Sequence, residues 1–216
     1  MRRRCPHTYA RYPVGMADYR TAPTVGARIA AARKSRGFKS TKDLADAIPG
    51  DSITGSILQN IEAGRKNDLA VAQLLNIAWA LGVSPTWILA PIGSPSEQID
   101  LPNIIPEIRD LTVAEFDAWL SGNTDGVYMP KTSDEHNDRI QLAALRELLK
   151  EKRELNRLLL ISPAYVDMSD ALSGDDAKGV LEDTEQRTIN STRRIARLEN
   201  YLASAGWAIH ELTLEY

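Results

Sequence analysis

Residues 52–66 read SITGSILQNIEAGRK and predict a short helix with a polar start and an end at glycine. Serine and threonine ahead of the first apolar residues are typical N-terminal caps. Leu58 and Ile61 are three residues apart, so they share one face, which must pack against a neighbouring element. Gly64 ends the helix, because glycine readily adopts the left-handed conformation that closes a helix. The opposite face is polar, and two basic residues follow it.

Four more short helices are expected beside this one, which itself covers about 54–63. Their predicted ranges are about 25–36, 41–48, 69–81 and a short stretch that begins at Pro85. The longest apolar row at helical spacing lies in the fourth helix, at Leu74, Leu75, Ile77, Ala78 and Leu81. We interpret three tryptophans as core residues, namely Trp79, Trp87 and Trp119.

The charge of the chain is divided unevenly along its length. Residues 1–92 carry 13 Lys and Arg against 6 Asp and Glu, a net charge of +7, whereas residues 93–216 carry 13 against 23, a net charge of −10. A basic first part with an acidic remainder is typical of a DNA-binding head on a body that does not bind DNA. Chance segregation of surface charge is the alternative interpretation.

Composition places the chain among globular proteins without disulfides. The apolar content of 43% and the charged content of 25% are ordinary. The single cysteine, Cys5, excludes an internal disulfide framework and fits a reducing compartment. No apolar run reaches the length of about 18 residues that a membrane span needs, and the basic start lacks the apolar core of a secretory signal. We expect a cytoplasmic, nucleoid-associated protein.

Four regions are expected along the chain. They are a flexible arm over 1–22, a five-helix domain over 23–93, a linker with one short helix over 94–136, and a helical domain over 137–216. The linker contains four prolines within 91–106, and its helix opens at the capping box Thr112-x-x-Glu115. Because Met16 is a second possible start, the status of residues 1–15 is left open. The fold class is all-α, although the last residues, 208–216, are compatible with a short strand.

Two long helices are predicted in the C-terminal third, over about 137–161 and 176–204, with Ser162-Pro163 ending the first. Both carry a seam whose residues are alternately three and four apart, which is the period of a coiled coil. The first seam consists of Leu142, Leu145, Leu149, Lys152, Asn156 and Leu159, widened by Leu148, Leu155 and Leu158. The second consists of Leu181, Thr184, Thr188, Ser191, Ile195, Leu198 and Leu202. We interpret the pair as an antiparallel hairpin whose remaining apolar surface meets a second copy.

The polar face of the helix over 54–63 carries the residue types that read DNA bases. Short donors and acceptors are needed in the major groove, and this face offers Thr54, Ser56, Gln59 and Asn60. Phosphate contacts on both sides of a reading helix fix its register, and the candidates are Thr41, Lys42, Arg65 and Lys66. The residues alone leave a second interpretation open, a solvated surface helix.

Four stretches together carry a family resemblance: GARIAAARKSRG over 26–37, TKDLADAI over 41–48, SILQNIEAGRKN over 56–67 and LLNIAWALGVSPTWIL over 74–89. They resemble the Cro/C1-type, or XRE, family of helix-turn-helix regulators over about 25–93, roughly a third of the chain. The resemblance implies a five-helix, lambda-repressor-like domain with its third helix in the major groove. The residues that match the family's base-facing positions are Thr54, Gly55, Ser56 and Asn60. The resemblance also implies a phosphate-binding cap at Thr41 and an ion pair between Arg33 and Glu62.

The chain departs from the family pattern at two places. The turn over 49–53 is about three residues longer than the compact family turn, and Thr41 stands where glutamine is more usual. The longer turn affects the register at the start of the reading helix. For the Arg33–Glu62 pair, an ordinary surface ion pair is the alternative interpretation.

No catalytic, metal or cofactor site is expected. The histidines His7, His136 and His210 are far apart, and the chain has no CxxC pair, HExxH motif or glycine-rich phosphate loop. The helical pattern of residues 107–216 also argues against the β-rich self-cleaving peptidase domain that some phage repressors carry. An effector pocket near Trp119 is a minor alternative.

The expected function is a sequence-specific transcriptional regulator, a repressor of the phage-immunity or autoregulatory type, acting on palindromic double-stranded DNA as a homodimer through its C-terminal helices. One alternative is the antitoxin of a toxin–antitoxin pair, whose C-terminal part binds the toxin. Others are a scaffold that has lost DNA binding and a monomer that binds an asymmetric site. Expected partners are DNA and a toxin or anti-repressor, with no membrane.

Overall fold

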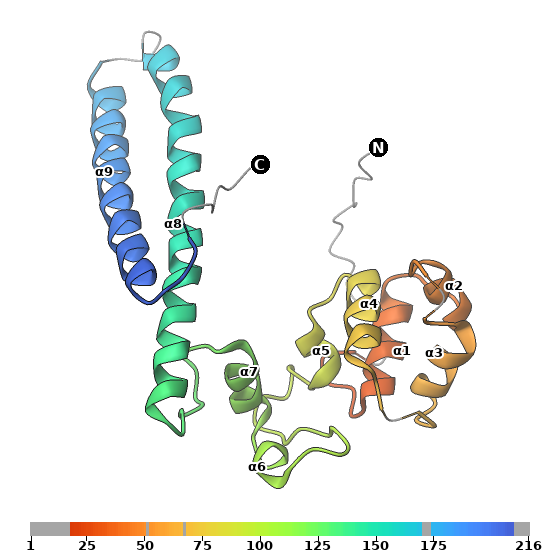
Figure 1. The fold of residues 1–216 in the computed structure, drawn as a ribbon. Coiled ribbons are helices and arrows are strands. Elements are labelled where there is room, and N and C mark those ends of the chain that lie inside the picture. Colours follow the sequence, from red (N-terminus) through yellow and green to blue (C-terminus); the bar gives the residue numbers. More distant parts are fainter. Residues whose placement is uncertain (1–17, 51, 67, 170–173, 210–216) are drawn as a thin grey trace. The chain divides into compact units, whose positions relative to one another are not determined.

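The protein is all-helical in the ranges described by the computed structural model, which are residues 18–50, 52–66, 68–169 and 174–209. For residues 161–169 and 174–181 the structure describes the backbone alone, except at Gly179. Within these ranges no strand is present, and the one isolated β-bridge joins Gln98 and Thr112 (Figure 1). The predicted all-α class is therefore confirmed.

The described chain forms two compact units, residues 18–121 with 125–128, and residues 122–124 with 129–209. The helices of the first unit are α1 (Val25–Ser35), α2 (Thr41–Asp46), α3 (Gly55–Glu62), α4 (Val71–Leu81), α5 (Pro85–Leu89), α6 (Pro106–Arg109) and α7 (Val113–Ser121). The second unit holds α8 (Ser133–Ser169) and α9 (Gly174–Ser204). The boundary between the two units falls near residue 121.

Side-chain caps start three of the first helices. Thr24 accepts the N–H of Ala27 ahead of α1, and Thr54 accepts the N–H of Ile57 ahead of α3. Ser40 forms a reciprocal capping box with the third residue of α2. These helices surround a core whose largest fully buried apolar members are Ile29, Leu44, Leu58, Ile61, Ile77, Leu81 and Ile88.

The prediction that Trp79 is a core residue is wrong. α4 turns Ile77 and Leu81 into the core, and Trp79 lies on another face with 88% of its surface exposed. Trp87 packs against the core at an edge-on contact with Tyr19. The sequence misleads because α4 is apolar nearly all round, so its periodicity does not show which face is buried.

The segment expected to be a linker packs against the helices that precede it. Ala90, Ile99, Val113 and Phe116 form a second buried cluster, joined by half-buried residues that include Trp119. The proline-containing segment supplies Ile99 to this cluster, whereas Val113 and Phe116 come from α7. Residues 94–121 are therefore part of the first unit, and their prolines shape a chain laid over the surface.

Arg28 of α1 fastens this segment to the first core, and none of its surface is exposed. Its Nε donates to the carbonyl of Ile88 at 2.8 Å, and its Nη1 donates to the carbonyl of Ala22 at 3.0 Å. Its Nη2 donates to the carbonyl of Leu89 at 3.1 Å and to Oδ1 of Asp100 at 2.6 Å. Burial lowers the pKa of Arg28, and the hydrogen bond and charge of Asp100 oppose that shift.

α8 and α9 run antiparallel (Figure 1). Ion pairs and a small apolar core join them. Arg194 pairs with Glu147 and Arg187 with Glu154, and between them the hydroxyl of Ser191 donates to Glu151. The contacts thus descend along α9 as they ascend along α8, as expected for antiparallel helices. The buried core residues are Ala144, Leu148, Ile195, Leu202 and Ile209. No helix of the described chain is long and apolar enough to cross a membrane.

The predicted seam matches α9 better than α8. Every described seam residue of α9 is buried or half-buried, whereas Leu181 lies outside the side chains that are described. Among the described side chains of α8 the buried apolar residues are Ala144, Leu148 and Leu158, while Leu159 is exposed. The buried face of α8 therefore differs from the predicted seam. Leucines lie on several faces of α8, so its sequence pattern does not show which face is buried.

The predicted end of the first long helix at Ser162-Pro163 is wrong, because α8 continues to Ser169. A proline removes one backbone donor, but its φ is compatible with a helix, so the helix can continue past it. The suggested C-terminal strand lies mostly outside the described residues. Ile209, which is described, is buried but not in a strand.

Candidate nucleic-acid interface

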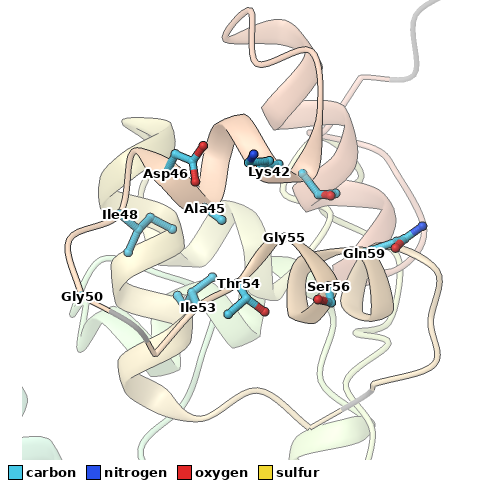
Figure 2. Close-up of a pocket in the computed structure, with 11 residues that line it drawn as sticks. Lys42, Ala45, Asp46, Ile48, Gly50, Ile53, Thr54, Gly55, Ser56 and Gln59 are labelled. Atoms are coloured by element: carbon cyan, nitrogen blue, oxygen red, sulfur yellow. The ribbon is translucent and has the colours of Figure 1, made fainter.

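α2 and α3 lie side by side around a hollow of about 570 Å³ (Figure 2). Six residues proposed from the sequence to contact DNA line it: Thr41, Lys42, Thr54, Gly55, Ser56 and Gln59. The remaining lining residues were not predicted, and they are Ala45, Asp46, Ile48, Gly50 and Ile53. Asn60, Arg65 and Lys66 do not line the hollow and lie toward the other end of α3.

The long turn between α2 and α3 is anchored at both ends. Ile48 and Ile53 are buried in the first core, while Pro49, Gly50 and Ser52 are exposed. The described residues between these two anchors are thus at the surface, and α3 begins at Gly55 directly after its cap Thr54. This packing supplies the register that the sequence left uncertain.

Gly55 has a packing role at this crossing. A Cβ built on Gly55 would lie 3.2 Å from Cα of Lys42 and 3.4 Å from its Cβ. Glycine thus permits the backbones of α2 and α3 to approach closely. The family resemblance placed Gly55 among the base-facing residues. In the structure a side chain at this position would also crowd the backbone of Lys42, which is a separate reason for glycine here.

A second glycine contact holds α3 against α1. A Cβ on Gly26 would lie 2.2 Å from the carbonyl oxygen of Ile61, closer than real atoms approach. Nothing in the local sequence marks Gly26, because a glycine near a helix start is ordinary. The signal that could have found it is a glycine inside a helix without an evident turn.

Ser56 and Gln59 present free polar groups on the exposed face of α3. Neither side chain makes a hydrogen bond within the described chain. Thr54 differs, because its hydroxyl oxygen accepts the N–H of Ile57 at 3.3 Å. Ser56 and Gln59 are thus the predicted readers that are available to an incoming ligand.

The basic residues after α3 are held against its end. Nε of Arg65 donates to Oδ1 of Asn60 at 2.9 Å. A residue predicted to bind phosphate is therefore hydrogen-bonded to a residue predicted to read bases. The backbone N–H groups of Arg65 and Lys66 both donate to the carbonyl of Asn60, at 2.9 and 3.1 Å. Nζ of Lys66 donates to the carbonyl of Asp68 at 2.6 Å. This cluster gives the C-terminal end of α3 a defined arrangement of positive charge.

Acidic groups limit what α2 can offer to an anion. Asp43 accepts the N–H of Ser40 at 2.8 Å, and the hydrogen bonds from Ser40 lower the pKa of its carboxyl group. Asp46 lines the hollow from the other end of α2. Ser40 and Asp43 are engaged in the cap of α2. Lys42 is the cationic residue of α2, and it lines the hollow.

Arg33 and Glu62 form the ion pair that the resemblance implies. Two parallel hydrogen bonds join them, Nε to Oε1 at 2.7 Å and Nη2 to Oε2 at 2.9 Å. Only 7% and 12% of the two side chains are exposed, so the alternative of an ordinary surface pair is wrong. Nη1 of Arg33 also donates to the carbonyl of Phe38 at 2.9 Å, and the hydrogen bonds that Arg33 donates to Glu62 raise the pKa of Arg33. The pair fixes α3 on α1.

The described residues hold no group of three or more His, Cys, Asp or Glu that could bind a metal ion. His136 is exposed at the start of α8, while Cys5, His7 and His210 lie outside the described residues. Trp119 packs beside Phe116 with ring centroids 6.0 Å apart. An effector pocket at Trp119 stays a prediction.

Comparison with known proteins does not assign this chain to a family: no family model, no curated protein and no solved structure matches it.

Proposed function

We propose that this protein is a sequence-specific DNA-binding regulator in which α2, the turn and α3 act as a helix-turn-helix. The observation that carries the proposal is the exposed polar face of α3 beside the hollow, where Ser56 and Gln59 are free and Lys42 is close by. Free amide and hydroxyl groups on a short helix are suited to base edges in the major groove. A cation beside them is suited to the adjacent backbone phosphate.

Rigid support of α3 adds to this proposal. Three contacts hold the helix: the Arg33–Glu62 pair, the close approach at Gly26 and the tight crossing at Gly55. A helix that reads bases must be held in a fixed orientation, since a small displacement breaks the hydrogen bonds that carry specificity. A merely solvated surface helix has no need of such support.

Charge at the two ends of α3 supports a DNA ligand as well. Lys42 lies near its start, and Arg65 and Lys66 lie at its end. Cations that flank a reading helix neutralise phosphates on both sides of the groove and release counterions. In this proposal the output is repression at a palindromic operator, with dimerisation through α8 and α9.

The test is selection of a bound sequence from a pool of random DNA duplexes, using the full chain. We expect one motif to be enriched, and Gln59→Ala to change the motif. Lys42→Ala should weaken binding to all duplexes and lower the salt slope by about 1. The matched control is Lys131→Ala, which removes an equally exposed cation from the second unit. Failure of the wild-type chain to bind any duplex at low salt would refute the proposal.

A further inference from the structure

α4 carries an exposed apolar row that the fold leaves without a partner. Val71, Leu75 and Trp79 are four residues apart and therefore lie along one face. Their exposed fractions are 72%, 50% and 88%. Large aromatic side chains are normally mostly buried, and grouped exposed apolar residues mark interaction surfaces. We call these three residues the α4 row.

The α4 row is separate from the proposed DNA-binding face. None of its members lines the hollow between α2 and α3. The core of the first unit is also satisfied without it, because α4 contributes Ile77, Ala78 and Leu81 to that core. The row therefore needs its own explanation.

We propose that the α4 row is a contact surface for α4 of a second copy of this chain. Residues four apart form a ridge on a helix, and the adjacent row forms a groove. Beside the ridge lies a row of smaller residues, Ala72, Asn76 and Ala80. A two-fold axis would place the ridge of each copy in the groove of the other, so the face is complementary to itself.

Charge favours a second copy over a charged partner. The helix reads VAQLLNIAWAL and contains no charged residue, although the first 92 residues of the chain have a net charge of +7. Two basic heads can approach closely only through a neutral face, since like charges elsewhere repel. An acidic or basic partner would find no opposite charge on α4.

The size of the face predicts a weak contact. Trp79 could bury about 200 Å² of its surface in such a contact. Val71 and Leu75 together could bury about 100 Å², an area obtained by dividing their transfer free energies by about 25 cal/mol per Å² and allowing for their partial burial. Two copies would then bury roughly 600 Å², below the roughly 1,200 Å² of stable complexes. The contact should therefore depend on concentration, and it should strengthen when another interaction brings two copies together.

The geometry of crossing helices supplies a direct test at Leu75, the middle residue of the α4 row. Helices whose ridges interlock lie about 8–10 Å apart, and Cα atoms lie about 2.3 Å from each helix axis. At the crossing point the two copies of residue 75 then have Cα atoms roughly 3.4–5.4 Å apart, which overlaps the range of about 4.4–6.8 Å found in disulfides.

The experiment measures disulfide formation between full-length copies in a Cys5→Ser background, without DNA. Leu75→Cys should form the dimeric disulfide at least about tenfold faster than Met129→Cys, because a preformed contact raises the local thiol concentration. Met129 is the matched control, since it is also apolar, is 80% exposed and lies outside α4. Circular dichroism should show unchanged helix content in both variants.

A second substitution tests the role of the tryptophan. Adding Trp79→Lys to the Leu75→Cys variant should remove the rate advantage, because a lysine in the contact would lose its hydration without meeting an opposite charge on α4. Equal rates for Leu75→Cys and Met129→Cys would overturn the proposal, as would a rate advantage that survives Trp79→Lys. The first outcome would also follow if another part of the same chain covers the α4 row. DNA is absent throughout, so the result is independent of the proposed DNA-binding function.

Discussion

Arg65 donates a hydrogen bond of 2.9 Å from its Nε to Oδ1 of Asn60. The two residues therefore do not act independently, although the sequence assigns one to base reading and the other to phosphate binding. Asn60 uses one amide oxygen to orient the guanidinium group of Arg65. Its amide NH₂ group is still available to an acceptor on a base edge.

This hydrogen bond changes the expected behaviour of variants at the end of α3. Arg65→Ala should weaken binding to all duplexes and lower the salt slope by about 1. Asn60→Ala should relax sequence preference and also lose part of the general affinity, because Arg65 loses its orienting partner. Titrations of preferred and scrambled duplexes at several salt concentrations would measure both effects. The double variant should lose less affinity than the sum of the two single losses, and strict additivity would mean that the pair is not coupled.

Gly26→Ala should be strongly destabilising. The new Cβ would meet the carbonyl oxygen of Ile61 at 2.2 Å, so α1 and α3 must separate. We expect a loss of about 3 kcal/mol or more in the unfolding free energy of the first unit. Thermal and urea denaturation followed by circular dichroism would measure it.

Gly179 provides the matched control for that substitution. It is an exposed glycine within α9, and a Cβ there would have no atom within 4 Å. Gly179→Ala should leave stability unchanged or raise it by about 0.5–1 kcal/mol, as expected for alanine in a helix interior. Similar destabilisation by both substitutions would contradict the close approach at Gly26.

Asp100→Ala should destabilise the first unit by about 2–4 kcal/mol, since it leaves a buried arginine without its counter-charge. Three backbone carbonyls still accept from Arg28, so the variant should fold.

A chain ending at residue 121 should be more stable than one ending at residue 93, because the shorter chain lacks Asp100 and the second apolar cluster. Equal melting temperatures for the two truncated chains would show that residues 94–121 contribute nothing.

The capping box of α7 predicts a pH effect. Hydrogen bonds from Thr112 lower the pKa of Glu115 below its ordinary value. A carboxyl group whose pKa is lower in the folded state stabilises the fold above its unfolded pKa, and this contribution disappears as the pH falls through the folded pKa. Stability should therefore decline on acidification below about pH 4.3, the ordinary pKa of a glutamate. Thr112→Ala should reduce that decline in acid denaturation curves, and an unchanged curve would contradict the assignment.

Local structure in this protein follows from the sequence alone. The caps at Thr24, Ser40 and Thr54 and the terminating glycines act on residues within one helical turn, so the positions of α1 to α5 are readable to within about two residues. The polar face of α3 could also be predicted from its residue types. The pairing of Arg33 with Glu62 was predicted through the family resemblance. The seam of α9 was predictable because its uncharged members recur three and four residues apart, whereas the charged residues of the helix lie on its other faces.

Tertiary structure decided what depends on distant partners. Arg28 and Asp100 are 72 residues apart, and no local pattern links them. α4 is apolar on most sides, so only packing shows that Ile77 and Leu81 are buried while Trp79 is exposed. The register of α3 also depends on burial of Ile48 and Ile53 on either side of the long turn. Propensity and capping are short-range and can be read along the chain, whereas the choice of which apolar face is buried depends on contacts between helices far apart in sequence.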